Sequence, residues 1–111
     1  MVGIEEVLKE LANMGVIKEK WIRRYTNILN GIKYQYEGRL PKWELKNFLT
    51  HISQIEKTSL RQEYNHFKRL RQLGFIESLI TANGEYWIIS DKFSSKLWKI
   101  YKSYRNWIKE K

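Results

Sequence analysis

The chain has 111 residues, a formal net charge of +9, 42% hydrophobic residues and 14% aromatic residues, which suits one compact domain with a buried core. Because cysteine is absent, disulfides, thiolate metal sites, iron–sulfur clusters and cysteine nucleophiles are excluded. Neither a signal peptide nor a run of about 20 apolar residues is recognisable, so we expect a soluble, cytoplasmic protein that does not engage a membrane.

The basic residues avoid the N-terminal segment. Three basic against four acidic residues give −1 over 1–20, and seven against three give +4 over 21–58. Residues 59–90 contain four basic and three acidic residues, a net charge of +1. Residues 91–111 contain seven basic and two acidic residues, a net charge of +5. A basic surface that only improves solubility explains the size of the charge but not its distribution. The excess of basic residues favours a polyanionic partner, with nucleic acid as the first candidate and an anionic membrane surface as the second.

The N-terminal third is predicted to be helical. Apolar residues recur at helical spacing over 4–14, with an end near Gly15, and again from Trp21 to Ile32, fading near Gly38. Residues 38–40 are expected to be extended, because Pro41 suits the first turn of a new helix rather than the continuation of an old one. Apolar positions from Leu45 to Ile52 predict that short helix. A polar turn over 53–58, anchored by Ile55 alone, is expected to follow.

The helix predicted over 60–73 has clear start and stop signals. Ser59 stands three positions before Gln62, which is a capping-box pattern, and Gly74 supplies the end. The predicted buried stripe consists of Leu60, Tyr64, Phe67, Leu70 and Leu73.

The spacing of apolar residues then changes to that of strands. Two runs, 75–80 and 85–90, flank Thr81-Ala82-Asn83-Gly84, and the Asn-Gly pair predicts a hairpin with a type I′ turn. Asp91 is the expected N-cap of a final helix, about 27 Å long at 1.5 Å per residue.

The segment Leu70-Arg71-Gln72-Leu73-Gly74-Phe75-Ile76-Glu77 resembles the L-x-x-L-G-[apolar]-I segment that ends the recognition helix of winged helix-turn-helix transcription factors. The resemblance covers 39–90. It implies an α+β, mainly α, winged helix within a single domain 1–111, with N-terminal helices over 1–37, a core over 39–90 and a C-terminal helix over 91–111. The turn between Ile52 and Ser59 looks several residues longer than the tight turn of the family. The composition is also similar in style to small regulators of archaea and their viruses, although seven asparagines leave the habitat open.

A recognition helix over 59–73 would enter the major groove and read base edges with its outward face. Arginine can pair with guanine, and asparagine and glutamine with adenine. Glu63 is the sole acid between Thr58 and Ile76, whereas a face built for solubility more often carries Glu and Lys. The alternative is an ordinary solvated face. The expected base contacts are Arg61, Gln62, Asn65, His66 and Arg69.

Phosphate contacts need less precise geometry and are expected around the same helix. Its N-terminus has a positive dipole end, and lysines flank it. The hairpin tip has neither Lys nor Arg, so we expect a light backbone contact rather than deep minor-groove insertion. The expected phosphate contacts are Lys42, Lys46, Lys57, Ser59, Lys68, Thr81 and Asn83.

The final helix has two interpretations. Its 4-3-4-3 apolar spacing is typical of a heptad seam, so it either folds back on its own domain or pairs with the same helix of a second subunit. Its aromatic content favours a homodimer. The expected interface consists of Phe93, Leu97, Ile100, Tyr101, Tyr104, Trp107 and Ile108. Lysines on the other face would contact DNA phosphates or simply solvate the helix.

Catalytic and metal-binding patterns are not recognisable. His51 and His66 have no acid or cysteine at ligand spacing, and the glycine-rich phosphate-binding and G-x-S-x-G motifs are absent. We therefore expect no enzyme, metal, cofactor or small-molecule ligand. The leading hypothesis is a sequence-specific double-stranded DNA-binding transcriptional regulator acting as a dimer. The alternatives are a winged helix for protein–protein interaction and an architectural protein that coats DNA without sequence choice.

Overall fold

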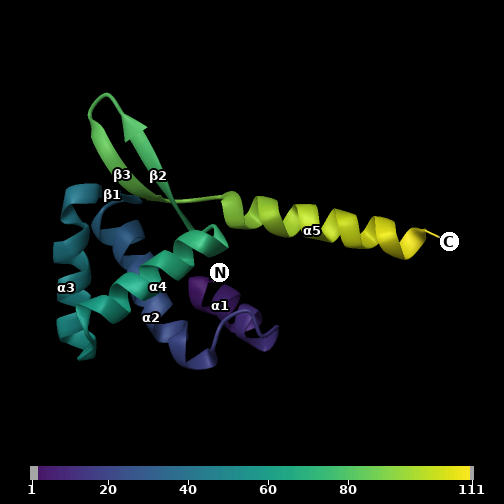
Figure 1. Ribbon diagram of the computed structural model, residues 1–111, viewed down its shortest axis with the longest axis horizontal. Helices are drawn as coiled ribbons and strands as arrows, with labels where there is room; N and C mark the ends of the chain where they lie inside the picture. Colours follow the sequence, from purple (N-terminus) through teal and green to yellow (C-terminus); the bar gives the residue numbers. More distant parts are fainter. Residues whose placement is uncertain (1–2, 111) are drawn as a thin grey trace.

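The computed structural model describes residues 3–110 and shows an α+β, mainly helical fold with one helix extending from the body (Figure 1). The long dimension, 54 Å against 37 and 28 Å, reflects that extension. The helices are α1 (Ile4–Asn13), α2 (Ile22–Asn30), α3 (Leu45–Glu56), α4 (Leu60–Leu73) and α5 (Lys92–Lys109), with short 3-10 turns at Glu19–Trp21 and Lys42–Glu44 and a π-helical turn at Gly31–Gln35.

A small antiparallel sheet lies beside the helices. It contains β1 (Arg39–Pro41), β2 (Ile76–Thr81) and β3 (Gly84–Ile89) in the order β1-β3-β2. The register pairs Leu40 with Trp87 and Thr81 with Gly84, so the extended piece predicted before Pro41 joins the edge of the hairpin.

The predicted hairpin is confirmed, but its predicted type I′ turn is wrong. The predicted turn requires positive φ at both Asn83 and Gly84, and Asn83 does not have it. Thr81 instead pairs with Gly84, so Ala82 and Asn83 are the central residues of the turn. The Thr81 hydroxyl instead accepts a hydrogen bond from the Asn83 N–H and donates one to the Gly84 carbonyl, both at 3.2 Å. A threonine side chain therefore closes the turn.

The core lies between the N-terminal helices, α3, α4 and the start of β2. Its fully buried side chains include Leu8, Ile28, Ile32, Leu40, Leu49 and Leu70. The buried residues of α1 (Leu8, Leu11) and those from Ile22 to Ile32 recur at steps of three and four, which confirms the helical periodicity of 4–14 and 21–32. The N-terminal helices therefore belong to the same core as the strands, and they cover one flank of α4.

The connection between α3 and α4 is shorter than predicted. The helix runs on to Glu56, and only Lys57, Thr58 and Ser59 separate it from α4. Lys57 takes a left-handed conformation with φ of 56°, and the Thr58 N–H bonds back to the Ser53 carbonyl at 2.9 Å. Ile55 is 63% exposed, so it does not anchor the turn. The prediction of a long polar turn is wrong.

The start and stop signals of α4 are confirmed. Gln62 N–H donates to the Ser59 hydroxyl and Ser59 N–H donates to the Gln62 side chain, each at 3.1 Å, which completes the capping box. Gly74 ends the helix with φ of 95°. At α5 the predicted N-cap position, Asp91, is confirmed, but its side chain makes no capping hydrogen bond, and the Ser90 hydroxyl accepts from the Lys92 N–H at 3.0 Å.

After its first two turns, α5 extends away from the body (Figure 1). Phe93 stacks on Phe75 with ring centroids 4.3 Å apart, and the Lys96 ammonium donates to the Gln72 carbonyl at 3.1 Å. The interpretation in which the whole helix packs on its own domain is therefore wrong for the part past Lys96. Within residues 3–110, no helix is sufficiently long and apolar to cross a membrane.

Candidate nucleic-acid interface

The orientation of α4 decides which of its side chains can reach a ligand. Its buried side chains are Glu63, His66, Phe67 and Leu70, whereas Tyr64 is 37% exposed. The helix is thus rotated about its axis relative to the predicted stripe, which placed Tyr64 inside and His66 outside. The rotation follows from the N-terminal helices, which pack on the flank that carries His66.

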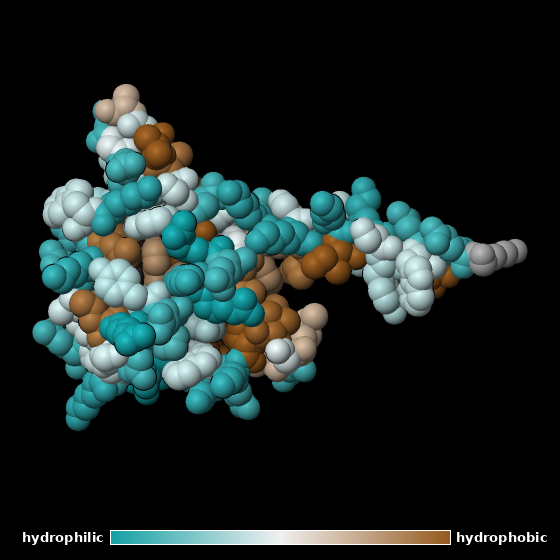
Figure 2. All heavy atoms as spheres, viewed as in Figure 1, coloured by the Kyte–Doolittle hydropathy of each residue, from teal (hydrophilic) through white to brown (hydrophobic). Residues whose placement is uncertain are grey.

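Four exposed polar side chains form the outward face of α4. Arg61, Asn65, Lys68 and Gln72 follow one another at steps of four, three and four residues, which places them on one side of the helix. Within the described residues no ion pair or side-chain hydrogen bond holds them. Figure 2 shows hydrophilic residues over this part of the molecule. We call this set the outward face.

Two predicted base contacts lie away from the outward face. His66 is 6% exposed and packs on Trp21 and Tyr25, at centroid distances of 4.6 and 5.3 Å. Burial lowers its pKa, and Arg24 lowers it further, so the ring is neutral near pH 7. Arg69 is half-buried, and its guanidinium donates to the Val16 carbonyl at 3.1 Å. Both side chains attach α4 to the N-terminal helices.

Gln62 and Ser59 have a local role at the start of α4. Both are exposed, but their side chains satisfy each other's backbone N–H groups in the capping box. Of the five predicted base contacts, Arg61 and Asn65 therefore share the outward face, and Gln62 lies beside it.

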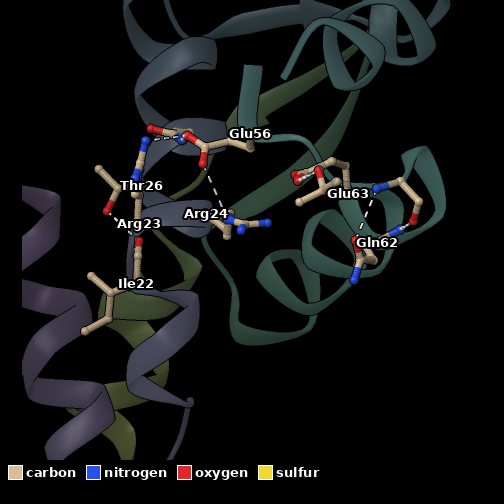
Figure 3. A network of polar contacts seen from close by, with 10 residues as sticks. Ile22, Arg23, Arg24, Thr26, Glu56, Gln62 and Glu63 are labelled. Atoms are coloured by element: carbon tan, nitrogen blue, oxygen red, sulfur yellow. Dashed lines mark hydrogen bonds and ion pairs between the residues drawn. The ribbon is translucent and has the colours of Figure 1, made fainter. Parts of the chain in front are cut away.

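A polar network around the buried Glu56 carboxylate joins the end of α3 to α2 (Figure 3). The Glu56 carboxylate, with its side chain 7% exposed, lies 3.3 Å from Arg23 and 3.6 Å from Arg24 and accepts from Asn27 at 2.6 Å. This network uses the last turn of α3 and extends that helix past its apolar residues. Only the Glu56 carboxylate is buried, since Arg23 is largely exposed, and removing its partners would leave that charge unpaired at a cost.

Glu63 continues the network inside α4. It is fully buried, accepts from the Thr58 hydroxyl at 2.8 Å, and has a second carboxyl oxygen without a partner among the described residues. Burial raises its pKa, while Thr58 and Arg24 oppose the rise. The single acid of the helix is therefore turned inward and does not repel an anionic ligand from the outward face.

A basic groove borders the outward face at the C-terminal end of α4. It has a volume of about 640 Å³ and lies between α4, β2 and the first turns of α5. Lys68, Arg71, Lys92 and Lys96 line it, together with Glu77, which pairs with Lys92 at 3.7 Å. Four cations against one acid make it attractive to a phosphate backbone. The sequence interpretation missed Arg71, although it lies three residues after Lys68 and hence on the same side.

Trp87 joins α4 to the hairpin. Its ring meets Phe67 edge-on at 5.3 Å, and the cations of Arg71 and Lys42 lie 4.3 and 4.6 Å from its centroid. Such contacts position both cations at the seam between helix and sheet. Lys42 also lies 4.0 Å from Glu85.

The remaining predicted phosphate contacts are distributed around this seam and the turn. Lys46, Lys57 and Lys68 are exposed, and Asn83 is exposed at the hairpin tip. Thr81 uses its hydroxyl to close the tip. Lys68 thus belongs to the outward face, Lys42 lies with Arg71 on the Trp87 ring, and Lys57 precedes the N-terminus of α4.

Comparisons with protein-family models, with curated proteins and with solved structures find no match to this chain. Within the part of the chain that the structure describes, no group of three or more His, Asp or Glu residues is arranged to hold a metal ion.

Proposed function

We propose that the chain is a winged-helix protein that binds double-stranded DNA sequence-specifically and acts in the cytoplasm as a dimeric transcriptional regulator without enzymatic activity. The observation that carries the proposal is the outward face of α4. It combines a cation with amide side chains at helical spacing, beside a basic groove and with the only acid of the helix buried. These are the groups that recognise base edges and phosphates.

The arrangement of elements supports the same proposal. Two helices joined by three residues, followed by an antiparallel hairpin, form the order that the resemblance implies. Helix-turn-helix motifs have connections of this length. In this arrangement α4 is the recognition helix, Asn65 and Arg61 read bases, and Lys68 and Arg71 contact phosphates.

The proposal is tested with a duplex selected from a random pool, measured beside an unselected duplex. For Asn65→Ala we expect a loss of about 5- to 100-fold on the selected duplex, from a bidentate contact of about 1–3 kcal/mol, and little change on random duplex. Asn13→Ala is the matched control, because Asn13 is exposed at the end of α1. Unchanged selectivity in Asn65→Ala and Arg61→Ala would contradict base recognition by α4.

Salt dependence separates the alternatives. Lys68→Ala should weaken binding on both duplexes and reduce the salt slope by about 1, with Lys9→Ala on α1 as the control. A coating protein, which the net charge of +9 favours, would show the steep slope without any preference for the selected duplex. A protein-interaction module would bind both the selected and the random duplex weakly.

A further inference from the structure

The helix α5 exposes an apolar stripe that its own body does not cover. Leu97, Ile100, Tyr104 and Trp107 are between 43% and 66% exposed. They follow one another at steps of three and four residues, so they share one side of the helix. Contiguous apolar surface of this kind marks an interaction site.

An apolar groove opens on the body at the base of α5. Its volume is about 960 Å³, and it lies between α1, α2, the π-helical turn, the end of β3 and Phe75, which directly precedes β2. Its apolar lining includes Ile4, Val7, Leu29, Phe75 and Ile89. Phe75 also stacks on Phe93 in the first turn of α5, so groove and stripe begin at the same place. Figure 2 shows apolar residues on the lower side of α5 and on the neighbouring part of the body.

The charges of the two surfaces are opposite. The α1 segment Ile4–Asn13 has three glutamates against one lysine, a net of −2. The α5 segment Lys92–Lys109 has six basic residues and no acid, a net of +6. Two α5 helices paired only with each other would bring like charges together. An α5 helix placed along the α1 of another copy meets glutamates instead, although Lys33 also borders the groove.

We propose that α5 of a second copy docks in this groove, so that each subunit completes the groove of the other. This inference rests on the dimer of the proposed function and specifies its interface. Half the surface of a helix 18 residues long and ~10 Å in diameter is about 400 Å². Two helices and two grooves then bury about 1,600 Å², the size of a standard stable interface. The exchange is reciprocal, as a two-fold dimer requires.

Cysteine cross-linking tests the docking directly, because the natural chain has no cysteine. One chain carries Val7→Cys in the groove, and a second, distinguished by a tag, carries Leu97→Cys, Ile100→Cys or Tyr104→Cys. The chains are mixed and oxidised, so a cross-link of mixed mass forms only between subunits. The control is Lys102→Cys, which lies on the opposite side of α5. Circular dichroism confirms that each variant folds.

We expect a mixed cross-link from Val7→Cys to at least one stripe position and at least a tenfold lower yield with Lys102→Cys. If sedimentation shows a dimer that cross-links only between α5 helices, groove docking is wrong, whereas the dimer of the proposed function stands. If the wild-type chain sediments as a monomer at about 100 μM, roughly a hundredfold above a micromolar dissociation constant, both the docking and the dimer are wrong. In either case DNA binding by the outward face is tested independently by Asn65→Ala.

Discussion

Gly74 joins α4 to β2 where the first turn of α5 leaves no room for a side chain. Its φ of 95° is unfavourable for any residue with a Cβ. A Cβ placed there would lie 2.9 Å from the Phe93 backbone nitrogen and 3.2 Å from the Lys92 carbonyl carbon. Both atoms belong to the backbone and cannot rotate away. The Phe93 N–H also donates to the Gly74 carbonyl at 3.0 Å, which fixes the base of α5 against this residue.

These contacts set the expected cost of Gly74→Ala. The left-handed conformation costs about 1–2 kcal/mol, and the backbone displacement costs about 1–3 kcal/mol. The reduced entropy of the unfolded chain returns about 0.4–1 kcal/mol. We therefore expect the free energy of unfolding to fall by about 2–4 kcal/mol, a large share of the 5–15 kcal/mol that is typical of a domain.

Gly38→Ala provides the matched control, because Gly38 has φ of 84° and nothing within 4 Å of an added Cβ. It carries the conformational strain without the clash, so we expect a loss of about 0.5–1.5 kcal/mol. Urea unfolding followed by circular dichroism measures both variants. If Gly74→Ala is no more destabilising than Gly38→Ala, the close contact between α4 and the base of α5 does not exist as described.

Three further outcomes follow from the contacts of α4. Ser59→Ala removes the capping box and should lower the free energy of unfolding by about 1 kcal/mol, whereas Ser94→Ala on exposed α5 should not, as urea titration will show. Arg69→Ala should cost about 1.5–3 kcal/mol of stability and leave base preference unchanged, and Arg61→Ala should do the reverse in the same two assays. Because the pKa of His66 is lowered in the folded state, its neutral form contributes stability above the ordinary value of about 6.5 that is lost as pH falls below it. The free energy of unfolding should therefore fall more in wild type than in His66→Gln between pH 7.5 and 5.5, and parallel curves would contradict this.

The local signals in the sequence predicted the local structure well. The capping box at Ser59, the stop at Gly74 and the hairpin between 75 and 90 depend on residues close together in the chain, and the structure contains each of them. The helical spacing of apolar residues likewise placed α1 and α2, and Pro41 placed the extended segment that forms β1. Such features can be predicted without knowing which distant segments they contact.

The predictions that failed depend on contacts between distant segments. The polar end of α3 remains helical because Glu56 meets two arginines of α2, which apolar spacing does not reveal. His66 and Glu63 face inward because the N-terminal helices and Thr58 provide aromatic and polar surroundings on that flank. A count of apolar residues assigns such side chains to the surface. The outward face was therefore predicted about one-fifth of a turn away from where it lies.

The most direct test of the account follows side-chain amide signals by nuclear magnetic resonance while the selected duplex is added. The NH₂ groups of Asn65 and Gln72 lie on the outward face, whereas that of the half-buried Asn27 is bonded to Glu56. The account predicts large shifts for Asn65 and Gln72 with saturation at one duplex per dimer, and no shift for Asn27. Shifts confined to α5 or the hairpin, with Asn65 and Gln72 unchanged, would contradict DNA recognition by α4.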